Sequence, residues 1–221
     1  MPTPSEVRTA LQLLTADAVA VTLELSKQID GSSEARRAAL LESVPEVIGY
    51  YGDGAAALAA DAYDDERELA GVAAPFSSQP VVADRTVKIR RAVAWSSAPL
   101  FDGADDVALQ RLSGVVQAEV ARPFRDTMLT NRANDPESAG WRRITRGGCP
   151  MCRMLADRGA VYRKTTAIFA AHEDCHCTAQ PVFKTDVGEE ASVIQYMASR
   201  RNRTPATRDR LSSFLRDHYG A

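Results

Sequence analysis

All four cysteines of this chain, and two of its three histidines, lie between positions 149 and 177. We expect a reducing cytoplasmic compartment, because the N-terminal residues show no basic region followed by an apolar stretch. No apolar run approaches the roughly 20 residues of a membrane span. Cysteines gathered in one cytosolic cluster indicate metal binding or catalysis, whereas a disulfide framework needs an oxidising environment. This cluster therefore constrains the fold more than any other feature of the sequence.

Cys149 and Cys152 form a C-x-x-C pair that follows two glycines. Glycine allows a tight turn before the first cysteine. The two-residue spacing lets both thiolates reach one tetrahedral zinc ion at about 2.3 Å. The pair is therefore a candidate for the first half of a zinc site.

The second half of the predicted site lies at His172, Cys175 and Cys177. His172 and Cys175 repeat the two-residue spacing, at a distance from the first pair close to the roughly 15–20 residues usual in structural zinc modules. If a strand begins here, Cys175 and Cys177 share one face and His176 faces away. We predict a structural Zn²⁺ held by the C-x-x-C pair, by His172, and by either Cys175 or Cys177.

Two other interpretations of the cluster remain. A redox-active C-x-x-C pair normally opens a helix after a strand of a thioredoxin-like unit, and nothing before Cys149 resembles one. A catalytic zinc keeps one position open for water and needs a carboxylate nearby, which Glu173 and Asp174 could supply. Because the segment offers more ligands than one zinc ion needs, we favour a closed structural site.

The first part of the chain has the apolar spacing of long helices. Thr3-Pro4-Ser5-Glu6 is a start signal, with a cap, a first-turn proline and a capping box, and it predicts one long helix. Ser43-Val44-Pro45-Glu46 repeats this chemistry and predicts a second start. A third helix is expected over 82–95, and a fourth over 109–128 with a kink at Pro123.

The pattern changes after Asn134-Asp135-Pro136-Glu137. Short β-branched and aromatic runs follow and predict three strands, at 141–145, 161–162 and 178–183. Helices are expected at 151–157, at 190–200 and from Thr204 onward. We therefore predict a mainly α protein with a helical body (1–135), a zinc-stapled α+β module (136–185) and a helical tail (186–221).

Charge is divided unevenly along the chain. Residues 1–140 carry 13 Lys+Arg and 21 Asp+Glu, a net −8, whereas residues 141–221 carry 14 and 8, a net +6. The division favours either ordinary solvated surfaces or a basic surface for nucleic acid or an acidic partner. Two arginine clusters could neutralise phosphates: Arg142, Arg143 and Arg146, and Arg200, Arg201, Arg203, Arg208 and Arg210.

Motifs for other chemistry are not apparent. The sequence has no G-x-x-x-x-G-K-[ST], G-x-G-x-x-G or G-x-S-x-G motif, so we expect neither nucleotide binding nor a serine nucleophile in such an elbow. A cysteine nucleophile would need a histidine outside the cluster, and His218 is the single candidate.

The segment from Trp141 to Phe183 reads GW-R-x-I-x-x-GGCPMCRMLADRGAVY, then a loop and H-x-x-CHCTAQPVF. It resembles the C-terminal module of MuF-like minor head proteins, relatives of the phage Mu F protein found in tailed phages, especially those of actinobacteria. The N-terminal helical stretch, with Tyr50-Tyr51 and the alanine-rich run from Ala55 to Tyr63, is similar to their helical part. In this resemblance the cysteine–histidine module falls on Cys149, Cys152, His172, Cys175 and Cys177.

The resemblance implies a virion protein that is made in the host cytoplasm and is present in few copies inside the head. Its expected partners are the portal, the scaffold or the major capsid protein, with packaged DNA as a further candidate and no membrane. Its expected role is head morphogenesis or DNA delivery. Related actinophage proteins are often labelled capsid maturation proteases, so cleavage of scaffold or capsid protein is the alternative function.

Overall fold

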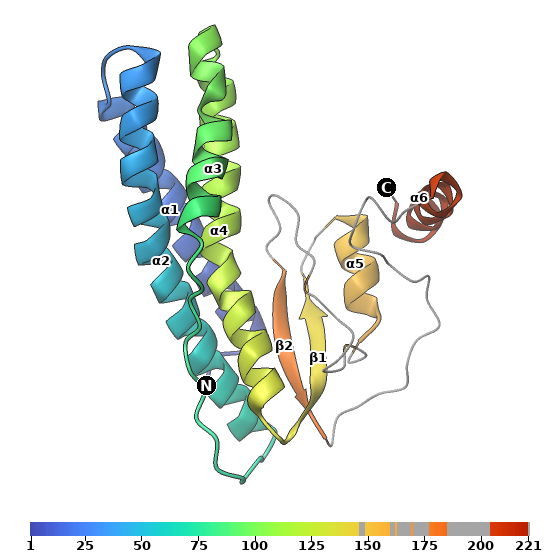
Figure 1. Ribbon diagram of the computed structural model, residues 1–221. Coiled ribbons are helices and arrows are strands. Elements are labelled where there is room, and N and C mark those ends of the chain that lie inside the picture. The colour runs from blue at the N-terminus through green and yellow to red at the C-terminus, as the bar shows by residue number, and fades with distance from the viewer. Residues whose placement is uncertain (146–148, 160–161, 163–168, 170–176, 185–203, 221) are drawn as a thin grey trace.

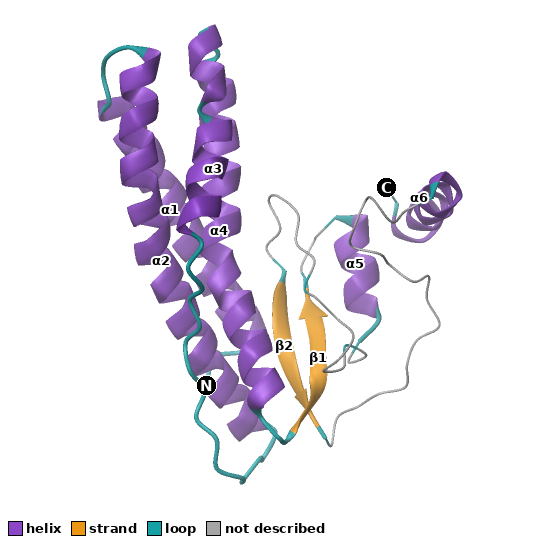
Figure 2. Ribbon diagram, viewed as in Figure 1, coloured by secondary structure: helices purple, strands orange, loops and turns teal. Residues whose placement is uncertain are grey.

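The computed structural model describes residues 1–145, 149–159, 162, 169, 177–184 and 204–220. Within these residues the protein is mainly α-helical with one two-stranded sheet, as Figure 2 shows, and this confirms the predicted class. A long helical bundle stands beside a smaller unit that contains the sheet and two further helices (Figure 1).

Helix α1 spans Pro4–Gln28 and begins where the sequence predicts. The N–H of Glu6 donates to Thr3 Oγ1 (3.3 Å), and the N–H of Thr3 donates to Glu6 Oε2 (2.7 Å), so the capping box is complete. Pro4 occupies the first turn, where the N–H that it lacks would have no helical partner.

Helix α2 spans Ser33–Leu69, so the predicted start at Ser43 is wrong. Its cap is Ser32, whose hydroxyl accepts a hydrogen bond from the Ala35 N–H (3.3 Å). Pro45 lies inside the helix, at a cost of about 3 kcal/mol. Buried apolar residues on both sides of Pro45 offset that cost, because each stabilises the fold by roughly 1.5–3 kcal/mol.

Helix α3 spans Thr86–Ser96 and begins later than the predicted position 82. The preceding chain, from residue 72 to 85, runs without helix along the bundle. Asn131 of α4 (Asp105–Asn134) fixes this stretch, because its Oδ1 accepts from the N–H of Gln79 (2.9 Å) and its Nδ2 donates to the carbonyl of Gln79 (2.8 Å).

The short 3₁₀ helix η1 (Ala98–Asp102) connects α3 to α4. Helix α4 continues as one helix on both sides of Pro123. Its apolar stripe packs against α1, α2 and α3 along the bundle (Figure 1). The core of this part is formed by Ala18, Leu40, Val44, Ile48, Val93, Leu112, Val116 and Val120.

Strands β1 (Ser138–Ile144) and β2 (Thr178–Phe183) pair in antiparallel register, which confirms two of the predicted strands. Tyr162 adds a single bridge to β1: the N–H of Trp141 donates to the Tyr162 carbonyl (2.9 Å), and the N–H of Tyr162 donates back (3.3 Å). Val161, the other residue of the third predicted strand, lies outside the described residues.

Helices α5 (Pro150–Asp157) and α6 (Pro205–Tyr219) lie close to their predicted positions. They pack against each other through the buried side chains of Met154, Leu155 and Leu211. The helix predicted over 190–200 lies outside the described residues.

One apolar core joins the lower end of the bundle to the sheet. Its members come from α1, α2, α4 and both strands: Val7, Leu11, Ala59, Tyr63, Phe124, Met128, Trp141, Ala179 and Phe183. The division of the chain at position 135 stays a prediction, and this core is continuous across that position.

Candidate metal centre

Two of the predicted metal ligands lie at the start of α5. Cys149 occupies the cap position, and Cys152 is the third helical residue. Pro150 stands between them at the first helical position, which tolerates the loss of an N–H. Cys152 is buried and Cys149 partly buried, and both side chains belong to one apolar group.

Cys177 brings a third thiol to this group from the residue before β2. Its Sγ donates to Oγ1 of Thr145 (3.3 Å), and its carbonyl accepts from Nε of Arg125 (3.1 Å). Because Arg125 belongs to α4, the bundle helps to fix the position of this cysteine. The three cysteines pack together with Phe169, and we call this group the cysteine cluster.

The other two predicted ligands, His172 and Cys175, lie outside the described residues. Among the residues that the structure does describe, no three His, Cys, Asp or Glu side chains form a group that could hold a metal ion. The three clustered thiols are nevertheless the soft ligands that zinc prefers. The donor chemistry fits Zn²⁺, and the zinc site itself stays a prediction.

Aromatic and basic side chains border the cysteine cluster. The Arg143 guanidinium lies 3.9 Å from the ring centroid of Phe169, and the Arg125 guanidinium lies 5.3 Å from it. The Trp141 indole stacks on Tyr162 at a centroid distance of 4.3 Å and lies 5.3 Å from Phe169. Positive charge beside the cluster would offset the negative charge of thiolate ligands.

A buried ion pair joins the bundle to the chain that enters the sheet. Arg67 of α2 donates through Nε to Oδ2 of Asp135 (2.7 Å), and the Tyr63 hydroxyl donates to the same oxygen (3.1 Å). The backbone N–H of Glu137 donates to Oδ1 (2.9 Å). Burial opposes ionisation of Asp135, but these hydrogen bonds outweigh it and lower its pKa. Burial and the nearby carboxylate raise the pKa of Tyr63.

A second polar connection links α2 to β2. The Gln180 amide nitrogen lies 2.8 Å from both carboxylate oxygens of Glu66, and the Gln180 oxygen accepts from Nε of Arg142 (2.7 Å). Burial raises the pKa of Glu66 despite the hydrogen bond from Gln180.

The basic cluster predicted beside the first cysteines is not a continuous exposed surface. Arg143 is only 3% exposed and packs on Phe169, so burial removes it from contact with phosphates. Arg142 is exposed, and Arg146 lies outside the described residues.

The junction residues Tyr63, Arg67 and Asp135 were not expected from the sequence. The sequence feature that could have indicated them is an arginine one turn after a tyrosine, on the buried face of a helix that is otherwise rich in alanine. Such an arginine needs a carboxylate partner, because a buried charge is stable only when it is paired. The sequence does not reveal which carboxylate supplies that partner.

His218 does not form a catalytic pair in the described structure. It lies exposed on α6, where its Nδ1 is 3.0 Å from the Phe214 carbonyl and its ring stacks on Phe214 at 4.3 Å. The carboxylates considered for a zinc-activated water, Glu173 and Asp174, lie outside the described residues. The part of the chain that the structure describes therefore offers no nucleophile–histidine dyad built on His218.

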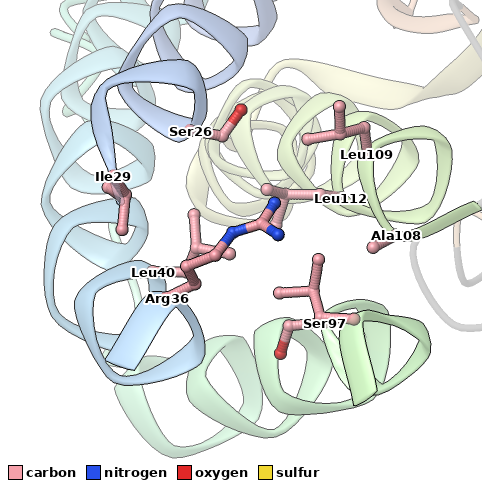
Figure 3. Close-up of a pocket in the computed structure, with 9 residues that line it drawn as sticks. Ser26, Ile29, Arg36, Leu40, Ser97, Ala108, Leu109 and Leu112 are labelled. Atoms are coloured by element: carbon pink, nitrogen blue, oxygen red, sulfur yellow. The ribbon is translucent and has the colours of Figure 1, made fainter. Parts of the chain in front are cut away.

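A small cavity lies at the end of the bundle where α1 gives way to α2 (Figure 3). Its volume is about 10 Å³, which is room for one water molecule. Arg36 extends among its leucine side chains, and its Nη2 pairs with Asp105 (2.9 Å). The cavity is too small to hold a substrate.

Comparison with known proteins identifies the family. The sequence model of the VG15 protein family matches residues 3–203, which is most of the chain. The chain belongs to the VG15 family. As a VG15 protein it belongs to a viral, bacteriophage protein family, and this confirms the coarser part of the expectation from the sequence. No curated protein and no solved structure matches the chain.

None of the described helices of this VG15 protein is both long enough and apolar enough to cross a bilayer.

Proposed function

We propose that this VG15 protein is a minor head protein of a tailed phage, acting in head morphogenesis or DNA delivery near the portal. Membership of a phage family and the resemblance of the segment from Trp141 to Phe183 to MuF-like modules support the proposal. The observation that carries it is the docking of that segment, as a sheet with a cysteine cluster, on a long helical bundle. A rigid unit of this kind suits binding to neighbouring head proteins.

We also propose that a structural Zn²⁺ completes the unit. The cysteine cluster would hold it together with His172, with Cys175 as the alternative to Cys177. The support is the packing of three thiols from two distant segments of the chain. Zinc at this place would tie α5 to β2, and its binding free energy would contribute directly to folding.

Co-expression with the portal, scaffold and major capsid protein of the same phage tests the head role. We expect the chain to sediment with assembled heads, and its omission to lower the yield of normal heads. Mass spectrometry should find identical scaffold and capsid termini with and without the chain. Heads that assemble normally and never contain the chain would contradict the proposal.

The same experiment tests the alternative, a capsid maturation protease. Glu173→Gln and Asp174→Asn keep the side-chain shape and remove the carboxylates beside the predicted ligands, so they would disable a zinc-activated water. His218→Ala removes the histidine outside the cluster. We expect normal processing with all three variants. A variant that folds, binds zinc and leaves scaffold or capsid protein uncleaved would replace the structural role with the protease.

A further inference from the structure

The outer surface of α2 carries an acidic ridge. Six exposed carboxylates recur there at helical spacing, at Glu42, Glu46, Asp53, Asp61, Asp64 and Glu68. None of them belongs to an ion pair among the described residues, whose pairs involve other acids. A row of like charges on one helix surface is repulsive unless a cationic surface neutralises it.

The outer surface of α3 is basic and partly apolar. Lys88, Arg90 and Arg91 are exposed, the helix contains no acidic residue, and no described ion pair involves these three cations. Val87 is 61% exposed and Trp95 is 50% exposed on the same helix. Exposed tryptophan and arginine together are the side chains most enriched in the energetic centres of protein interfaces.

A groove separates the acidic ridge from the basic ridge. It has a volume of about 300 Å³ and is lined by Pro45 and Gly49 of α2, by Val82 and Ile89 around the start of α3, and by Pro123 of α4. Figure 1 shows α2 and α3 side by side along the bundle, and the groove confirms that they border the same hollow. The three features therefore form one face, with opposite charges on its two sides.

Helix α3 lies beside the first half of α2, across the groove. From the groove, α3 runs toward one end of the bundle, whereas the later part of α2 runs toward the other end (Figure 1). A two-fold axis that lies in the face, along the groove, would turn the second copy over and place each α3 on the first half of the α2 of the second copy, where Glu42 and Glu46 are exposed. Val87 to Trp95 spans about 12 Å and Glu42 to Glu46 about 6 Å, at 1.5 Å per helical residue, so the basic ridge is long enough to cover both carboxylates.

We propose that two copies of this chain pair through this face, with the basic ridge of each on the acidic ridge of the other. A face with opposite charges on its two sides is complementary to itself under a two-fold rotation, which is the requirement for a closed dimer. The exposed Val87 and Trp95 supply apolar contact area at its centre. Nucleic acid fits less well, because the carboxylates of α2 next to the basic ridge would repel phosphates.

Sedimentation equilibrium of the full chain tests the pairing. We expect a dimer at micromolar concentration whose dissociation constant rises as NaCl increases from about 50 to 500 mM, because exposed charges are screened. The double variant Arg90→Glu/Arg91→Glu should raise the dissociation constant by at least about 30-fold, since each substitution acts twice in a two-fold interface. The variant Arg208→Glu/Arg210→Glu makes the same charge change on α6 and should have no effect.

A charge exchange makes the test specific to α2 and α3. Glu42→Lys/Glu46→Lys should also weaken the dimer, and combining it with Arg90→Glu/Arg91→Glu in one chain should restore pairing. All four positions are exposed, so circular dichroism should show unchanged helix content. A monomer at low salt, or a combined variant that fails to pair, would overturn the proposal. Binding of duplex DNA by a monomeric wild type, lost in the α3 variant, would overturn it in favour of nucleic acid.

Discussion

Arg67 and Asp135 are 68 positions apart in the sequence and form an ion pair whose side chains are 7% and 0% exposed. The pair connects the end of α2 to the residue that follows α4 and precedes the sheet. Arg67 also donates to the carbonyl of Ala74 through both terminal nitrogens (3.1 and 3.0 Å). The guanidinium thus holds together α2, the loop after it and the entrance to β1.

Replacing Asp135 with alanine should destabilise the protein by about 3–5 kcal/mol, because it leaves a buried guanidinium without its counter-charge. Urea unfolding followed by circular dichroism measures the change. Asp102→Ala, at an exposed carboxylate on η1, is the control and should cost less than about 0.5 kcal/mol. Equal stability of the two variants would show that the buried pair contributes little.

The pH dependence of stability should carry the signature of Glu66. Its pKa in the folded protein lies above the ordinary 4.5, so folding favours the protonated carboxyl, and this stabilisation is lost as pH rises through the folded pKa. Glu66→Gln should therefore gain stability relative to the wild type between about pH 4 and 7. Asp135 acts in the opposite sense. Its pKa is lowered in the folded protein, so its ionised form stabilises the fold above the unfolded pKa, and this stabilisation is lost as pH falls through the folded pKa. A constant difference between Glu66→Gln and wild type across this range would contradict the first expectation.

Elemental analysis of protein purified without chelator should find one zinc ion per chain. Cys149→Ser and Cys152→Ser should each lose the metal and raise protease sensitivity around α5, because a structural zinc contributes its binding free energy to folding. His218→Ala, outside the cysteine cluster, should keep the zinc content of the wild type. Folded wild-type protein without any metal would end the zinc proposal.

Gly49 offers a stabilising substitution. A Cβ at this helical position would meet no atom within 4 Å, so Gly49→Ala should raise the free energy of unfolding by about 0.5–1 kcal/mol through helix propensity alone. Gly71 is the contrasting site. Its φ of +66° is unfavourable for alanine, and Gly71→Ala should destabilise the protein although the space beside it is equally open. Thermal unfolding of the two variants distinguishes backbone conformation from packing.

The basic C-terminal segment gives a separate prediction about DNA. If Arg200, Arg201 and Arg203 contact phosphates, duplex affinity should fall steeply between about 50 and 200 mM salt, and their replacement by alanine should flatten that slope. Fluorescence anisotropy with a labelled duplex provides the measurement. Binding that does not respond to salt would leave protein contacts as the role of these arginines.

The sequence predicts the ends of helices where local chemistry decides them. The capping box of Thr3 and Glu6 is a contact within one turn, so the start of α1 is correct. Pro45 fails as a start signal, because its neighbours on both sides are buried against α1 and α4 and hold the helix through it. A local sequence pattern cannot predict that these residues of α2 are buried, because the residues that cover them lie in other helices.

At the candidate site, too, the sequence predicts local groupings but not contacts between distant segments. Spacing alone predicts one group of Cys149, Cys152, His172, Cys175 and Cys177, because short fixed spacings are typical of ligands that share a site. Of these, the structure packs Cys149, Cys152 and Cys177 together. The pairs Arg67–Asp135 and Glu66–Gln180 join positions far apart in sequence, and their partners are set by how the sheet lies on the bundle. Only the structure reveals such partners.

The core shared by the bundle and the sheet contains residues from both sides of position 135, so a cut at that position would divide the core. A fragment that ended there would expose Tyr63, Phe124 and Met128, all buried in the full protein, to water. Bundle and sheet should therefore melt in a single cooperative transition. Exchange of either part between related phages should succeed only when both sides of the shared core are inherited together.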